Sequence, residues 1–343
     1  MNKILVMPVK NEAWIIEKTL LCASLWFDYI IVADQNSRDD TAKICKKFKK
    51  VVYIENKEIE YNEGTRRQLL LNKAREFKGD NLIFALDADE ILSANILNNQ
   101  NFSKSLKNLK PGMSIKMEWI QLWGDSYHYN SSFPWGGGIG NFAYYDDRKM
   151  NFDTGRIHCS RVPESTLNNA ITIKDIKVLH FQFVDQQRMM SKQNYYRLFE
   201  YQELKNNFLK INYKYHSTKE PTKLKVIPHE WLKKYSENNI DFNNFIKENF
   251  FWQDLYILNK FQEYNIKKFK WLDIWDVNWE EKRKIILNFN QNIFKIPNQE
   301  VKDPRNLIIK LYHSKIQRII SYKKMHDIIT YNKLFYKIFK ITK

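Results

Sequence analysis

The chain of 343 residues is long enough to bury a substantial core, and its 43% hydrophobic and 15% aromatic content excludes an intrinsically disordered protein. Its 56 Lys and Arg residues exceed its 39 Asp and Glu residues, which gives a net charge of +17. This excess favours an anionic partner, whether nucleic acid, a membrane surface or a phosphorylated substrate, and composition alone does not choose among them.

The three cysteines have no metal-like spacing and cannot all pair with one another, which is typical of free thiols in a reducing compartment. The first apolar run meets polar residues at Lys10, too early for a secretory signal. No stretch approaches ~18 uninterrupted apolar residues, the length that a membrane-spanning helix needs. These features predict a cytoplasmic protein.

The first 92 residues alternate between strand and helix patterns. Apolar runs predict strands at residues 4–7, 29–33, 51–54 and 82–86, and helical spacing predicts helices at residues 12–26, 41–48 and 63–77. Repeated β-α units of this length imply a mostly parallel sheet with right-handed crossovers, flanked by helices. Ligands of such sheets bind at the carboxyl ends of the strands.

The pattern changes after residue 92. Residues 93–185 are less regular, with a strand predicted at 114–122 and a glycine-rich loop at 136–140. From residue 186 onward the chain has a mainly helical pattern. We therefore expect an α/β domain over residues 1–185 and a largely helical C-terminal region over residues 186–343.

Polar residues follow three of the predicted strands, at 8–12, 34–41 and 87–90. In a parallel sheet these loops converge on one edge, so their side chains can share a ligand. Asp87 and Asp89 lie one residue apart directly after a buried strand, and two carboxylates there can bind a hard cation such as Mg²⁺ or Mn²⁺. The alternative is an ordinary polar exit from the strand, but the two companion loops favour the metal.

These motifs resemble the family 2 type of inverting glycosyltransferase, which has the GT-A fold. The matching residues are Pro8, Asn11 and Glu12 after the first strand, then Asp34-Gln35-Asn36-Ser37-Arg38-Asp39-Asp40-Thr41, then Leu86-Asp87-Ala88-Asp89-Glu90. They cover roughly the first quarter of the chain.

The resemblance implies a nucleotide-sugar donor bound at this edge of the sheet. The residues that it implies for the donor nucleotide are Pro8, Asn11, Glu12, Asp34 and Asn36. In this pattern Asp34 contacts the base or ribose, Asp89 holds the metal, and Asp87 faces the ribose or the metal.

Members of this family often carry a basic residue in the helix before the Asp-x-Asp strand, where this chain has Arg66 and Arg67. Either guanidinium can clamp the donor diphosphate through paired hydrogen bonds. The alternative for both is an arginine on a solvated helix face.

Residues 156–164 are similar to the short His- and Glu-bearing segment that follows the acceptor region in lipopolysaccharide-type members. Residues 178–183 are similar to the strand that returns a histidine to the metal. The resemblance therefore implies His180 as a third metal ligand, since a neutral imidazole is a ligand that divalent transition metals accept. A histidine among apolar residues is also commonly just packed in the core. His158, in the preceding segment, is a second candidate ligand.

An inverting transfer needs a carboxylate that takes the proton from the attacking hydroxyl. The candidates are Glu164 and then Asp125. Many members have an acidic pair after a Trp-Gly loop, but the loop that begins at Trp135 and Gly136 lacks the acid, which leaves the base open.

Residues 301–343 hold eleven Lys and Arg against two Asp, a net charge of +9, and apolar residues are interleaved with them. This pattern is typical of a helix that lies on an anionic membrane surface. The alternative is a terminal helix packed on the domain with a solvated basic face. Sequence motifs of nucleic-acid-binding proteins are absent, so nucleic acid is not expected as a partner.

Together these patterns predict a metal-assisted inverting hexosyltransferase. We expect a nucleotide-sugar donor, most commonly a UDP-sugar, and a surface glycan or lipid-linked acceptor, as in lipooligosaccharide or capsule synthesis. Such an enzyme would work in the cytoplasm or at the inner face of the membrane. Two alternatives remain, a non-catalytic glycan-binding or scaffold protein on the same fold and a nucleotidyltransferase, although the latter usually has a glycine-rich basic signature after its first strand.

Overall fold

The computed structural model describes residues 1–58, 62–132, 135–153, 155, 159–216, 223–289 and 296–316. The chain divides into two compact units. The first comprises Met1–Asp185 and Thr222–Lys247, and the second comprises Gln186–Pro221 and Glu248–Lys343.

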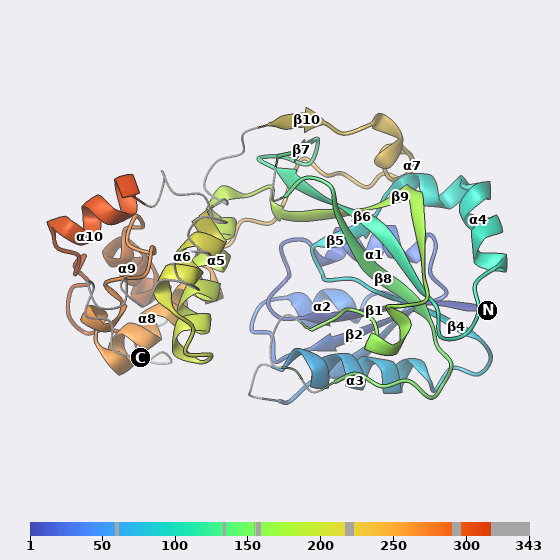
Figure 1. Cartoon of the computed structure of the whole chain (residues 1–343), viewed down its shortest axis with the longest axis horizontal. Helices are drawn as coiled ribbons and strands as arrows, with labels where there is room; N and C mark the ends of the chain where they lie inside the picture. The colour runs from blue at the N-terminus through green and yellow to red at the C-terminus, as the bar shows by residue number, and fades with distance from the viewer. Residues whose placement is uncertain are drawn as a thin grey trace. The chain divides into compact units, whose positions relative to one another are not determined.

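The centre of the first unit is a sheet whose first four strands are parallel (Figure 1). These strands are β1 (Asn2–Val9), β2 (Tyr29–Asp34), β3 (Val51–Glu55) and β4 (Asn81–Ala85), in the spatial order β4-β1-β2-β3. The helices that follow the first three are α1 (Ile16–Ser24), α2 (Thr41–Cys45) and α3 (Glu63–Ala74). The predicted fold class, a mostly parallel sheet flanked by helices, is confirmed.

Alternate residues of the buried strands point to opposite faces of the sheet, and each face has its own helices. Leu5 and Met7 of β1 join the core cluster that contains Leu20 of α1, whereas Ile4 joins the cluster that contains Leu71 of α3. All five side chains are almost fully buried. Burial of each contributes about 1.5–3 kcal/mol to the stability of the sheet.

The rest of the sheet extends from β4. Its strands are β5 (Glu90–Leu92), β6 (Ser114–Trp123), β7 (His128–Asn130), β8 (Gly138–Tyr145), β9 (Ala170–Phe183) and β10 (Leu224–Val226). The short helices in this part are η1 (Ala94–Asn98), α4 (Gln100–Lys107) and η2 (Glu164–Thr166). The strand β9 pairs with β5 on one side and with β6 on the other, so His180 lies opposite both Glu90 and Gln121.

Residues 222–247 belong to the first unit, whereas the sequence pattern places them in the C-terminal region. After β10 this segment forms η3 (His229–Trp231) and α7 (Lys233–Glu237). The buried Tyr235 hydroxyl donates to the Leu92 carbonyl at 2.8 Å, and the Ser126 hydroxyl donates to the Phe242 carbonyl at 2.7 Å. The segment returns because its apolar side chains complete a core cluster with β5, β6 and β9.

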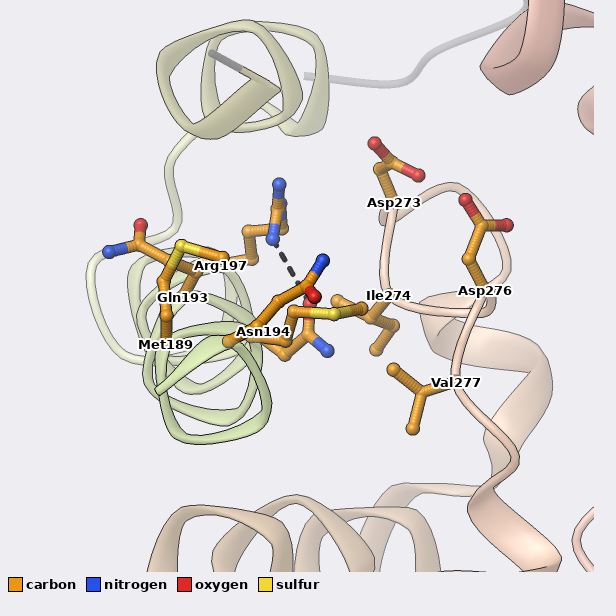
Figure 2. A pocket seen from close by; sticks show the side chains of 10 residues that line it. Met189, Gln193, Asn194, Arg197, Asp273, Ile274, Asp276 and Val277 are labelled. Carbon is orange, nitrogen blue, oxygen red and sulfur yellow. Dashed lines mark hydrogen bonds between the residues drawn. The ribbon is translucent and has the colours of Figure 1, made fainter. Parts of the chain in front are cut away.

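The second unit is mainly helical in its described residues, as predicted. Its helices are α5 (Gln186–Gln202), α6 (Phe208–His216), α8 (Trp252–Tyr264), η4 (Ile266–Phe269), α9 (Trp279–Phe289), α10 (Leu307–Leu311) and the π-helical turn Tyr312–Ile316. Phe261 stacks on Trp275 with ring centroids 5.0 Å apart and meets Trp279 edge to face at 5.5 Å. A cavity lies between α5 and the loop at residues 273–277 (Figure 2).

Much of the predicted basic tail, residues 317–343, lies outside the described residues. The described part of the tail includes α10, in which Leu307 and Ile308 are 84% and 69% exposed. Within the part of the chain that the structure describes, no helix has both the length and the apolar character to cross a bilayer.

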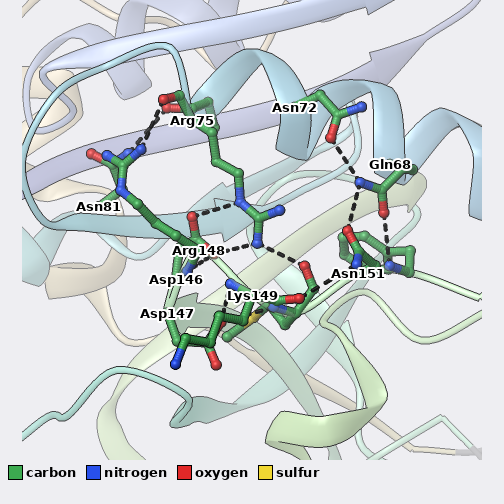
Figure 3. Close-up of polar contacts among 12 residues, drawn as sticks. Gln68, Asn72, Arg75, Asn81, Asp146, Asp147, Arg148, Lys149 and Asn151 are labelled. Carbon is green, nitrogen blue, oxygen red and sulfur yellow. Dashed lines mark hydrogen bonds and ion pairs between the residues drawn. The ribbon is translucent and has the colours of Figure 1, made fainter.

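A polar network fastens the end of α3 to the loop after β8 (Figure 3). Arg75 donates to both carboxylate oxygens of Asp146, at 2.9 and 2.8 Å, and to the Met150 carbonyl at 2.7 Å. Arg148 donates to the carbonyls of Arg75, Phe77 and Gly79, at 2.8–2.9 Å, which satisfies backbone acceptors left over where the helix ends. This network fixes α3 and therefore the two arginines that it carries toward the polar edge of the sheet.

Asp146→Ala should lower the free energy of unfolding by about 2 kcal/mol, because it leaves the Arg75 guanidinium without its paired acceptor. Glu76→Ala, which removes an exposed ion pair between the turn after α3 and Lys73, should change it by less than about 0.5 kcal/mol. Urea unfolding followed by circular dichroism measures both. Equal losses in the two variants would contradict a structural role for the network.

Candidate active site

The loops after β1 and β2 are bound to each other by side-chain caps on backbone N–H groups. The Asn11 N–H donates to the Ser37 hydroxyl at 2.7 Å, and the Arg38 N–H donates to the Asn11 side-chain oxygen at 2.7 Å. The Glu12 N–H donates to the Thr41 hydroxyl at 2.8 Å. The structure thus brings two of the three predicted loops together at the carboxyl ends of the strands.

Both loops contain a left-handed residue that asparagine tolerates well, Asn11 at φ 53° and Asn36 at φ 55°. Asn36 is exposed, whereas Asn11 is buried. The half-buried Pro8 pairs with Ala33 across β1 and β2. The Glu12 carboxylate accepts from the Trp14 indole N–H at 2.7 Å.

Asp34 is buried and organises the loop that follows it. One carboxylate oxygen accepts from the N–H and the hydroxyl of Ser37, at 3.0 and 2.5 Å, and the other accepts from the Tyr53 hydroxyl at 2.7 Å. Burial and this hydrogen bond raise the pKa of Tyr53, so the phenol remains a donor. The predicted contact of Asp34 with a base or ribose stays a prediction beside this structural role.

Positive charge gathers at the same edge. Burial lowers the pKa of Lys10, and the neighbouring cations Arg66 and Arg38 lower it further, while Asp34 opposes the shift. Repulsion among neighbouring cations is typical of a site that binds an anion. The sequence prediction included Arg66 but missed Lys10 and Arg38, although both lie inside the polar motifs.

Arg67 is the second predicted arginine of α3. Burial lowers its pKa, and the nearby Asp87 opposes that shift. Its Nε–H group is buried and has no hydrogen-bond acceptor among the described residues. A buried guanidinium with unused donors can bind the oxygens of a phosphate.

The sequence prediction missed Arg161, which binds the Asp-x-Asp loop. Its guanidinium donates to both oxygens of Glu90, at 2.7 and 2.8 Å, and to Asp87 at 2.8 Å. The same group lies over the rings of Trp119 and Phe142, 5.3 and 5.2 Å from their centroids. Burial raises the pKa of Glu90, and Arg161 counters that effect.

Asp89 and His180 face each other, with His180 Nε2 3.4 Å from the Asp89 carboxylate. The other ring nitrogen of His180, Nδ1, lies 2.7 Å from the Gln121 side-chain oxygen, and Trp119 stacks on the ring at 5.0 Å. Because that oxygen only accepts, Nδ1 carries the proton in the neutral ring and Nε2 presents its lone pair to Asp89.

Two acceptors that face each other in this way fit a divalent cation, and the support from Gln121 is typical of a metal-binding histidine. Asp87, also predicted as a metal ligand, forms an ion pair with Arg161, and its metal role stays a prediction. In the described ranges no three His, Cys, Asp or Glu side chains gather as a metal cluster. His158 lies outside those ranges.

The two candidate bases differ in their surroundings. Glu164 is exposed and is the first residue of η2, three residues after Arg161. Burial acts to raise the pKa of Asp125, but the N–H groups of Tyr127 and His128 and the His128 ring lower it overall. The His128 ring nitrogen Nδ1 lies 2.8 Å from the Asp125 carboxylate.

Comparison with known proteins gives one match to a family model. Residues 4–99 match glycosyl transferase family 2, so the first unit carries a glycosyltransferase domain. The match spans the four parallel strands and all three polar loops. No protein in a search of curated sequences matches the chain.

Solved structures with a similar fold include S. aureus TarS 1–349 in complex with UDP, at 13% identity over 83% of this chain and 87% of that one, with a TM-score of 0.37. Glucosyl-3-phosphoglycerate synthase from Mycobacterium tuberculosis in complex with phosphoglyceric acid has 19% identity over 35% of this chain and 44% of that one, with a TM-score of 0.23. At these TM-scores the likeness carries no conclusion about activity.

Arg161→Met should lower the free energy of unfolding by about 3 kcal/mol, because the fully buried Glu90 would then have an unpaired charge. Adding Glu90→Gln should recover part of this loss, since a neutral amide costs less to bury. Urea unfolding of the two single variants and the double variant forms the required cycle. Strictly additive losses would show that the two side chains do not interact.

Proposed function

We propose that this chain transfers a sugar, with inversion, from a nucleoside diphosphate sugar to a hydroxyl of a surface glycan or lipid-linked acceptor. The observation that carries the proposal is the gathering of Lys10, Arg38, Arg66 and Arg67 at the carboxyl ends of the parallel strands, beside the Asp-x-Asp loop. The family match over residues 4–99 supports it independently. A UDP-sugar is the donor that we expect.

The cations act on the leaving group. As the bond from the sugar to the donor breaks, negative charge grows on the nucleoside diphosphate. Guanidinium groups that are already desolvated stabilise this charge without reorganising, which lowers the barrier. The Nε–H of Arg67 is one donor for this role, because it is buried and has no acceptor among the described residues.

Asp89 and His180 would hold a Mn²⁺ or Mg²⁺ ion, and Gln121 and Trp119 fix the orientation of the imidazole. When bound, the ion supplies Lewis-acid stabilisation of the diphosphate oxygens. The protein contributes few ligands to such an ion, so donor phosphates and water would complete its coordination.

Asp87 would contact the donor rather than the metal. Arg161 fixes its carboxylate, but the side chain is 39% exposed and can accept a hydrogen bond from a ribose hydroxyl. Arg161 therefore acts as a positioning residue, because it donates directly to Asp87 and to Glu90 of the same loop.

For the base, the surroundings favour Glu164 over Asp125. Asp125 accepts hydrogen bonds from its own turn and has a lowered pKa, which weakens it as a proton acceptor. Glu164 is exposed to an approaching acceptor and belongs to the segment that Arg161 attaches to the Asp-x-Asp loop. A proton from the attacking hydroxyl would pass to this carboxylate as the new glycosidic bond forms.

We also propose that the chain contacts an anionic membrane surface from the cytoplasmic side. Exposed Leu307, Ile308 and Leu311 in α10 directly precede a strongly basic segment. Apolar residues next to basic ones suit the headgroup region of a bilayer. This placement would bring the enzyme to a lipid-linked acceptor.

Calorimetric titration of UDP, GDP and CMP, with and without Mn²⁺, tests the donor site. One nucleotide should bind to the wild type only with metal, and Asp89→Ala should lose that binding while Asp40→Ala, an exposed residue of the same edge, keeps it. Failure of all three nucleotides to bind the folded protein would overturn the transferase proposal and favour the scaffold alternative.

Glu164→Gln should lower kcat by about 10³-fold and leave nucleotide affinity unchanged, because it removes a proton acceptor but no donor contact. Asp125→Asn is the matched control and should retain most of the activity. Transfer is measured from the identified nucleotide-sugar to an acceptor extract. The opposite ranking of the two variants would reassign the base to Asp125.

A further inference from the structure

The second unit contains a cavity of about 170 Å³ between α5 and the loop at residues 273–277 (Figure 2). Its lining is drawn entirely from this unit, so the cavity does not belong to the candidate active site. The α5 side chains Asn194 and Arg197 lie on one side of it, and Ile274 and Val277 lie on the other.

Arg197 supplies a buried cation. It is 3% exposed, and its terminal nitrogens donate to the Asn194 side-chain oxygen at 3.0 Å and to the Tyr215 carbonyl at 2.9 Å. Its Nε–H has no acceptor in the described part of the chain. Burial of such a donor without a partner is unfavourable, and a ligand acceptor would recover that cost.

Asn194 supplies a second donor. Its side-chain oxygen accepts from Arg197, and its amide N–H₂ group is a hydrogen-bond donor. The side chain is 4% exposed, so this amide is held in place by its surroundings. A ligand that accepts hydrogen bonds would therefore satisfy these two neighbouring donors.

The opposite side supplies acceptors. Asp273 and Asp276 line the same cavity, and both raise the pKa of Arg197 against the lowering by burial. Asp276 is also ion-paired with Arg305 at 3.1 Å, so the carboxylates and guanidinium groups at this place nearly balance in charge. These charges favour a neutral ligand that both donates and accepts hydrogen bonds. Hydroxyl groups have both properties.

We propose that this cavity binds one saccharide ring through its hydroxyl groups. Asn194 and Arg197 donate to the hydroxyl oxygens, Asp276 accepts from a hydroxyl, and Ile274 and Val277 cover the apolar C–H face of the ring. The volume lies below the roughly 300 Å³ at which pockets for drug-sized ligands begin, so it holds a single ring rather than an oligosaccharide. This inference does not depend on the proposed function.

The test uses the full chain without nucleotide or metal. Glucose, galactose, mannose and N-acetylglucosamine are added one at a time, and saturation-transfer NMR detects binding. At least one sugar should bind the wild type. Val277→Trp should abolish binding by filling the cavity that Val277 lines, and Asn194→Ala should weaken it by about tenfold through the loss of one donor.

Val226→Trp, an exposed valine of the first unit, is the matched control and should bind as the wild type does. Thermal melts identify variants that fail to fold. If Asn194→Ala fails, Val277→Trp decides, because Val277 is only half-buried. The inference is overturned if no sugar binds, if Val277→Trp binds normally, or if UDP with Mn²⁺ displaces the sugar, which would place it in the donor site.

Discussion

The charge of Glu90 is the constraint on which the candidate active site depends. This carboxylate is fully buried at the start of β5, and a buried charge is tolerated only when it is paired and hydrogen-bonded. Arg161 meets it with two parallel hydrogen bonds, and the same guanidinium reaches Asp87. One ion pair thus joins the Asp-x-Asp loop to the segment that carries Glu164.

Strand pairing and a fixed polar partner position His180 at the other end of the site. His180 reaches the loop because β9 pairs with β5 and β6 at once, and Gln121 on β6 fixes which ring nitrogen carries the proton. Nε2 of His180 then lies 3.4 Å from the Asp89 carboxylate. A rigid sheet therefore positions the pair proposed to bind the metal, while the cations proposed to contact the donor lie on loops and on α3.

Hydrogen-bond partners distinguish two kinds of arginine in this protein. Arg161 is saturated with carboxylate partners and serves the architecture of the site. Arg67 and Arg197 each have a buried Nε–H group that no described residue accepts, and desolvation lowers the pKa of both. Unused donors in a desolvated setting are where ligand binding recovers free energy, so these two arginines lie at the centre of the two ligand sites proposed.

Strand and helix periodicity are local properties of the sequence, and so is the position of Asp87 and Asp89 after an apolar run. These properties were enough to predict the four parallel strands, their helices and the three polar loops. They did not determine the partners of those loops. Arg161 lies 71 residues from Glu90, and Gln121 lies 59 residues from His180, so only strand pairing and packing could select them. Residues 222–247 likewise return to the first unit because their side chains complete a core cluster there. Local sequence patterns do not predict such packing.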